Sequence, residues 1–257
     1  MDESTGIMRR IDFMIAGVQK SGTTALYTFL SQHPKIFLPA EKELHFFDNE
    51  RLAWNRPDYS SLRQHFSACP DGCIAGEATP IYTYWRPAAL RIQRYNPEIR
   101  LIVMFRNPIE RAYSHWRMEV SRGNDDLDFG EAIRDGRRRV IMNAEVSGCH
   151  RIFSYVERGF YAEQIQRLLS LFAPDQLLFV RTEDFWNRHT ETLGCVCDFL
   201  GVDRFAEFPK QSYVVPMENS DPRTISPEDR TYLLDLYSDD IKHAQRLTGR
   251  DLSAWIA

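Results

Sequence analysis

The segment from Ile11 to Thr24 constrains the fold of this chain more than any other. It begins with a short apolar run, 11–16, which is typical of a buried strand. A loop of mostly small residues follows, and apolar residues then recur at helical spacing, at Ala25, Leu26, Phe29 and Leu30. A strand, a glycine-bounded loop and a helix in this order present backbone N–H groups to a phosphate at the helix N-terminus. We therefore predict an anion site in this loop.

The loop differs from the nucleoside-triphosphate P-loop in two ways. Gly17 and Gly22 have the spacing G-x-x-x-x-G, but Thr23 stands where the P-loop lysine follows, and the lysine of this loop is Lys20. The apolar run 101–105 is followed by Arg106, where a Mg²⁺-dependent enzyme needs an aspartate. The sequence therefore favours an anion site that works without a metal ion. A P-loop kinase and a non-catalytic nucleotide-binding protein remain alternatives.

Strand and helix patterns alternate along the rest of the chain. Besides 11–16, strands are expected at 35–38, 73–77, 101–105 and 177–180, and further helices at 58–66, 87–95, 108–120, 127–139, 161–172, 193–200 and 226–248. This order predicts an α/β fold, with a central parallel sheet flanked by helices. Ligands bind at the carboxyl ends of the strands in such folds, and the candidate motifs follow those ends.

Composition bears on partners and location. The net charge is −4 and the pI about 6.0, so no overall basic field favours nucleic acid. No apolar window approaches the roughly 18 residues of a membrane span, and the polar start of the chain does not resemble a signal peptide. Five cysteines, an odd number, favour free thiols in a reducing compartment, so we expect a cytoplasmic protein.

Three motifs carry a family resemblance. Gln19-Lys-Ser-Gly-Thr-Thr24 resembles the 5′-phosphosulfate loop of sulfotransferases that use 3′-phosphoadenylyl sulfate (PAPS). Arg106-Asn-Pro-Ile-Glu-Arg-Ala-Tyr-Ser114 is similar to their 3′-phosphate motif, R-x-P-x-x-R-x-x-S. Ala40-Glu-Lys-Glu-Leu-His-Phe-Phe-Asp48 resembles the segment that holds the catalytic glutamate in the heparan-sulfate-type branch, which contains the N-deacetylase/N-sulfotransferases and 3-O-sulfotransferases.

The resemblance implies a P-loop-like three-layer fold, PAPS as co-substrate, adenosine 3′,5′-bisphosphate (PAP) as product, and no metal. The 5′ end would be held by the loop, and the 3′-phosphate by Arg106 and Ser114. Tyr161 and Arg223 correspond to weaker family features near the nucleotide. The cofactor-binding set is then Lys20, Ser21, Gly22, Thr23, Thr24, Arg106, Ser114, Tyr161 and Arg223.

The resemblance also implies a chemistry. Glu43 would be the general base, with His45 supporting it or serving as the base itself, and Lys20 would stabilise the leaving oxygen. Alternation along an extended segment would place Glu43 and His45 on the same side. The acceptor would be a hydroxyl, less favourably an amine, of a carbohydrate, glycolipid or natural product.

One position departs from the heparan-sulfate-type pattern. Relatives often carry a lysine where this chain has Ala78, so either another cation serves or the acceptor is not an anionic polysaccharide. We expect one sulfotransferase domain over 1–257, in which insertions at about 48–70 and 120–155 form a lid on the acceptor side. The sequence gives no indication of the oligomeric state.

Overall fold

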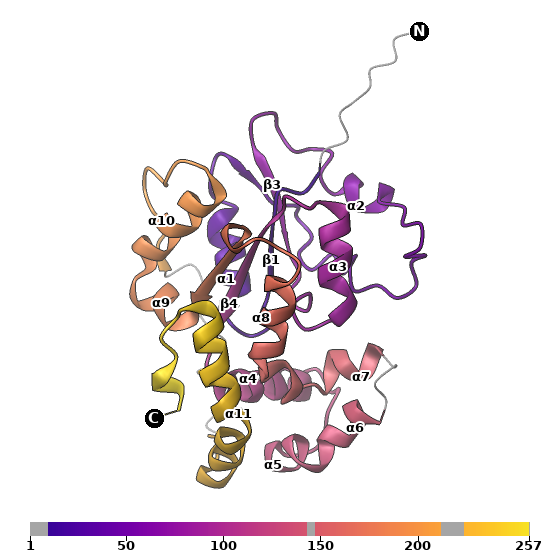
Figure 1. Cartoon of the computed structure of the whole chain (residues 1–257), viewed down its shortest axis with the longest axis vertical. Helices are drawn as coiled ribbons and strands as arrows, with labels where there is room; N and C mark the ends of the chain where they lie inside the picture. The colour runs from indigo at the N-terminus through magenta and orange to yellow at the C-terminus, as the bar shows by residue number, and fades with distance from the viewer. Residues whose placement is uncertain (1–9, 143–146, 212–223, 257) are drawn as a thin grey trace.

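The computed structural model (Figure 1) describes residues 10–142, 147–211 and 224–256. Its five-stranded sheet has the order β2-β3-β1-β4-β5. Every pair of neighbouring strands is parallel. This confirms the predicted fold class. The strands are β1 (Phe13–Gly17), β2 (Ile36–Phe37), β3 (Ile74–Ala78), β4 (Arg100–Phe105) and β5 (Leu177–Arg181).

The central strand β1 buries both of its faces. Met14 and Ala16 pack into one hydrophobic cluster, whereas Phe13 and Ile15 pack into a second cluster. Successive side chains of a strand point to opposite faces, so a strand covered on both sides must be apolar throughout. That requirement explains the unbroken apolar run in the sequence.

Helices cover the two faces of the sheet and make a three-layer structure (Figure 1). Helices α3, α4, α8 and α11 pack into the cluster that contains Met14, and α1, α9 and α10 pack into the cluster that contains Phe13. The α-helices are α1 (Thr23–Leu30), α2 (Ser60–Gln64), α3 (Arg86–Tyr95), α4 (Pro108–Ser121), α5 (Phe129–Ile133), α6 (Arg138–Ile141), α7 (Ser147–Ile152), α8 (Tyr161–Leu169), α9 (Thr182–Asn187), α10 (His189–Leu200) and α11 (Pro227–Thr248). None of the described helices has the length and apolar character needed to cross a membrane.

The predicted helix 127–139 is wrong in its extent, because the chain there is broken into α5, a 3₁₀ turn (Asp135–Arg137) and α6. Arg137 and Arg139 turn to buried or half-buried carboxylates, whereas Arg138 is exposed. Arg139 binds Asp125 through two hydrogen bonds of 2.8 and 2.9 Å, and Arg137 binds Glu157 at 2.8 Å. These contacts come from residues distant in sequence, so helical periodicity did not reveal them.

Candidate active site

The glycine loop, residues 17–24, connects β1 to α1 and leaves the N–H groups in the first turn of α1 without intrahelical acceptors. Gly17 packs so closely that a Cβ atom there would lie 2.3 Å from Thr83 Oγ1, and Gly22 has the left-handed φ of 88° that L-residues rarely adopt. Gly22 is the N-cap of α1, so the N–H groups of Thr23 and Thr24 lie in a first turn, where no intrahelical acceptor exists. The loop therefore has backbone donors available for the anion site that we predict.

Ser21 contributes less to the glycine loop than the sequence suggests. Its side chain is fully buried, and its N–H donates to the carbonyl of Val18 at 3.2 Å. Thr182, at the start of α9, donates from Oγ1 to the carbonyls of Ser21 (2.9 Å) and Phe105 (2.8 Å). Thr182 thereby ties the loop to the end of β4, and no sequence motif pointed to it.

Arg106 lies at the carboxyl end of β4 and contacts the glycine loop directly. Its Nη1 donates to the carbonyl of Lys20 at 3.3 Å. Ser114 lies on α4 and is 7% exposed. Tyr161 is fully buried, and its hydroxyl donates to the carbonyl of Arg106 at 2.8 Å, so it supports Arg106 from the core and does not offer its ring to a nucleotide. Arg223 lies outside the described residues.

The carboxylate segment, residues 41–48, brings Glu43 and His45 together, but not as an extended strand. The prediction of strand-like alternation was wrong, because Glu43 (φ 63°) and His45 (φ 50°) both have left-handed backbone conformations. The segment is fastened to β3 by the Glu43 N–H, which donates to the Ala78 carbonyl at 3.0 Å. His45 Nε2 lies 3.6 Å from Glu43 Oε2, and Lys42 Nζ lies 2.5 Å from Glu43 Oε1.

Sequence reasoning missed two further members of this cluster. The buried Asp48 carboxylate accepts from His45 Nδ1 at 3.0 Å, and Arg151 Nη2 lies 2.5 Å from the same carboxylate. Arg151, on α7, also places Nη1 3.0 Å from His45 Nδ1. Asp48 was detectable as the acid that ends the Ala40–Asp48 motif, but nothing in the sequence marked Arg151.

The cluster fixes the charges of its members at neutral pH. The hydrogen bonds to Asp48 and Glu43 raise the pKa of His45 from 6.5 to about 9, although burial opposes them. Burial alone would raise the pKa of Glu43, but hydrogen bonds from His45 and Lys42 outweigh it and lower the pKa from 4.5 to about 2. Glu43 is therefore a carboxylate and His45 an imidazolium near pH 7.

Two cavities meet at Glu43. The loop cavity, about 700 Å³, is lined by residues that include Lys20, Thr23, Thr24 and Arg106. The arginine cavity, about 210 Å³, is lined by residues that include His45, Arg151 and Arg158. Gln19, Glu43, Pro80 and Arg122 line both cavities. A group bound in the loop cavity can thus face a group bound in the arginine cavity across Glu43.

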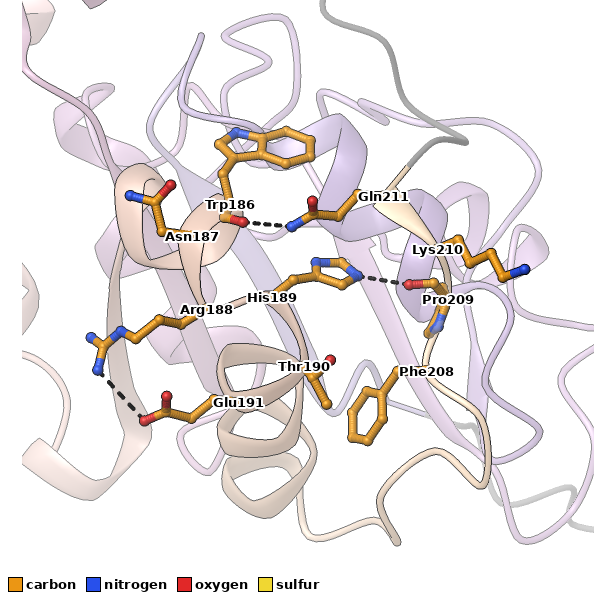
Figure 2. A pocket seen from close by; sticks show the side chains of 10 residues that line it. All are labelled: Trp186, Asn187, Arg188, His189, Thr190, Glu191, Phe208, Pro209, Lys210 and Gln211. Atoms are coloured by element: carbon orange, nitrogen blue, oxygen red, sulfur yellow. Dashed lines mark hydrogen bonds and ion pairs between the residues drawn. The ribbon is translucent and has the colours of Figure 1, made fainter.

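Figure 2 shows a third cavity, about 640 Å³, between the α9–α10 junction and the segment 208–211. Gln211 donates to the carbonyl of Trp186 at 2.5 Å, and His189 Nε2 lies 2.8 Å from the carbonyl of Pro209 (Figure 2). Trp186 and Asn187 also line the loop cavity. This cavity therefore adjoins the anion site but contains none of the predicted site residues.

Backbone strain is concentrated at the predicted catalytic residues. In the described part of the chain, the non-glycine residues with positive φ are Lys20, Glu43 and His45. Such conformations cost about 1–3 kcal/mol each and cluster at functional sites, where surrounding contacts hold them. The backbone thus singles out the same three residues as the motifs.

Comparison with known proteins agrees with this geometry. A family model described as the sulfotransferase domain matches residues 10–226. The human heparan sulfate glucosamine 3-O-sulfotransferases 3B1 and 6 are 32% and 34% identical over 194 residues, or 74% of this chain. The aligned region is 46% and 52% of those relatives, so the chain spans about half their length.

Solved structures show the same fold over most of the chain. A sulfotransferase from Alicyclobacillus acidocaldarius superposes with a TM-score of 0.82 at 27% identity, covering 97% of this chain and 100% of the other. A mouse sulfotransferase complexed with PAP superposes with a TM-score of 0.56 at 15% identity, covering 94% and 88%. At that identity the second likeness concerns the fold alone.

Proposed function

This chain belongs to the sulfotransferase family, in the heparan-sulfate-type branch that its motifs resemble, and we propose that it transfers a sulfuryl group from PAPS to a hydroxyl acceptor, with Glu43 as general base. One observation carries the proposal. Lys20, Glu43 and Arg106 come from three motifs far apart in the sequence, yet all three line the loop cavity. Among the charged groups of this lining, the two cations Lys20 and Arg106 suit a donor with anionic groups at two ends, and the carboxylate of Glu43 suits a proton to be removed.

PAPS carries anionic groups at its 5′ and 3′ ends, so its site needs two separate pockets. Lys20 and the first-turn N–H groups of Thr23 and Thr24 suit the 5′-phosphosulfate. Arg106, with Ser114 on the following helix, suits the 3′-phosphate. The hydrogen bond of 3.3 Å from Arg106 to the Lys20 carbonyl links the residues proposed for the two pockets.

The transfer step forms one sulfur–oxygen bond and breaks another. The acceptor oxygen attacks sulfur, and the bond from sulfur to the bridging oxygen of PAPS breaks, so that its electron pair leaves with PAP. Lys20 would stabilise the charge on that oxygen. Glu43 would take the hydroxyl proton, so that a sulfate ester and PAP are the products.

The charge states favour Glu43 over His45 as the base. An imidazolium with a pKa of about 9 has no lone pair available for a proton at neutral pH, whereas Glu43 is ionised. Glu43 is weakly basic, but sulfuryl transfer resembles phosphoryl transfer in having a loose transition state. In such a state the hydroxyl becomes acidic only after bonding to sulfur has begun, so a weak base suffices.

The arginine cavity indicates the kind of acceptor. Its lining is mostly polar and its volume of about 210 Å³ suits a group of roughly the size of one sugar ring. The three arginines of this lining, Arg122, Arg151 and Arg158, outnumber its two carboxylates, Glu43 and Glu119. The surplus of positive charge disfavours an ammonium group, which favours a hydroxyl over an amine. Ala78 is buried and offers no charge, whereas Arg122 borders both cavities and can take the place of the family lysine. We infer a carbohydrate, glycolipid or similarly polar natural product.

Calorimetric titration tests the donor site first. We expect tight binding of PAP that does not change with Mg²⁺, and weak binding of ATP. Incubation with ³⁵S-labelled PAPS and a panel of polyhydroxylated acceptors then tests transfer. Preference for Mg-ATP would instead indicate a P-loop kinase. PAP binding without any transfer or hydrolysis of PAPS would indicate a non-catalytic nucleotide-binding protein.

A further inference from the structure

Arg158 is a buried cation whose partners, among the described residues, are all uncharged groups. The residue is 2% exposed, and burial lowers the pKa of its guanidinium to about 10. Burying a charge without a counter-ion costs several kcal/mol, so a protein tolerates it only where hydrogen bonds compensate. The identity of those partners shows what the residue holds together.

The guanidinium of Arg158 joins the glycine loop to α7. Its Nη1 donates to Gln19 Oε1 at 2.5 Å. Its Nη2 donates to the carbonyls of His150 (2.8 Å) and Arg151 (3.2 Å), near the end of α7. Nε donates to Ser154 Oγ at 2.7 Å. One rigid, planar group therefore bonds the loop on one side and, on the other, the end of α7 and Ser154 just after it, more than a hundred residues later in the sequence.

The same short helix holds the base cluster. Arg151 contacts Asp48 at 2.5 Å and His45 at 3.0 Å through its side chain, while its carbonyl accepts from Arg158. Tyr84 steadies the helix from another side, because its hydroxyl lies 2.6 Å from His150 Nδ1 and its ring centre 5.2 Å from Arg158 Cζ. An unbroken series of contacts thus runs from Gln19 through Arg158 and α7 to His45.

We propose that Arg158 is a positioning residue that couples donor binding to the placement of the general base. The proposal rests on the function proposed above for the identity of the donor and the base. Gln19 lines both cavities, so a bound phosphosulfate would fix its side chain. A fixed Gln19 holds Arg158, Arg158 holds the backbone of α7, Arg151 on that helix holds Asp48, and Asp48 holds His45 beside Glu43.

Hydrogen–deuterium exchange with saturating PAP measures the coupling without relying on turnover. In the wild-type protein, PAP should slow exchange in the glycine loop and also, at least about five-fold, in α7. Arg158→Lys keeps the charge but loses the forked geometry. We expect it to bind PAP and protect the loop, while the effect of PAP on α7 disappears.

Two further variants keep the test decisive. Gln19→Leu removes only the hydrogen bond between Arg158 and the glycine loop, and it should also abolish protection of α7 by PAP. This variant keeps the proposal testable if Arg158→Lys does not fold. Arg167→Lys is the matched control. Arg167 lies on α8, is half-buried, and like Arg158 donates to a backbone carbonyl, that of Thr83 at 3.0 Å. Arg167→Lys should leave the protection of α7 unchanged.

Turnover gives a second measure of the same role. Arg158→Lys should lower kcat more than it changes the KM for PAPS, because the base would be misplaced although the donor still binds. Equal protection of α7 in Arg158→Lys and wild type, or no protection of α7 by PAP in the wild type, would overturn the coupling. Failure of PAP to bind the wild-type protein in the titration would instead overturn the donor site, and the coupling with it.

Discussion

The glycine loop and the carboxylate segment lie side by side, but they are built by different means. The glycine loop offers backbone N–H groups at the start of α1, and its shape depends on Gly17 and Gly22. The carboxylate segment offers side chains held by ion pairs, in which Asp48 holds His45 and Arg151 holds Asp48. A backbone site keeps its charge distribution at every pH, whereas an ion-paired site depends on the protonation of each member. Substitutions and pH should therefore affect the two regions differently.

The largest expected effect separates chemistry from donor binding. Glu43→Gln should lower kcat by about 10²- to 10⁴-fold, because it removes the proton acceptor, while PAP affinity stays within a few-fold. Turnover of labelled PAPS and calorimetry measure the two quantities. Glu41→Gln is the control, since that side chain is 67% exposed and should leave both unchanged. A large loss of PAP affinity with normal kcat would remove Glu43 from the role of base.

The second prediction concerns the donor side alone. Arg106→Ala should weaken PAP binding by about 10- to 100-fold, the value of a charge-assisted hydrogen bond of about 1.5–3 kcal/mol, and should weaken AMP binding much less. Calorimetry with both nucleotides tests this. Arg138→Ala, at a side chain that is 76% exposed, is the matched control. Equal losses for PAP and AMP would place Arg106 outside the 3′-phosphate pocket.

A smaller effect is expected where the two regions meet. Arg122 is 59% exposed and lies 3.3 Å from Glu119, so its contacts are partly screened by solvent. Arg122→Ala should raise the KM for the acceptor by no more than about five-fold and leave PAP affinity unchanged. Steady-state kinetics with the acceptor varied at saturating PAPS measures it. A selective loss of PAP binding would show that Arg122 contacts the donor and not the acceptor.

The smallest effect concerns stability and pH. The raised pKa of His45, about 9 against 6.5, means that its stabilising contribution is complete below pH 6.5 and is lost as the pH rises to about 9. The free energy of unfolding of the wild type should therefore fall, relative to His45→Gln, across that range. We expect less than about 1 kcal/mol, because the side chain is 38% exposed. Urea unfolding at a series of pH values measures it, and parallel curves for the two proteins would contradict the prediction.

Most of the fold could be predicted, and the principal candidate site residues could be named, because their signals are local. Buried strands are apolar runs, and the glycine loop and the Arg106–Ser114 motif are contiguous. The order of the strands along the chain then placed these motifs at one edge of the sheet.

What could not be predicted depends on contacts between distant segments. Arg151 reaches His45 across more than a hundred residues, and Arg139 leaves its expected helix for Asp125. Tyr161 matched a family feature near the nucleotide, but in the structure its hydroxyl supports Arg106 from the core. A side chain's neighbours are set by the packing of several elements, and periodicity along one element contains no information about them.

The left-handed backbone at Lys20, Glu43 and His45 has a consequence for engineering this protein. Glycine adopts such conformations without steric penalty, so Lys20→Gly or Glu43→Gly would relieve strain while deleting the functional side chain. A selection for thermal stability alone would therefore tend to remove the residues that we assign to catalysis. Selections for a more thermostable variant should keep these three positions unchanged and introduce substitutions away from the candidate active site.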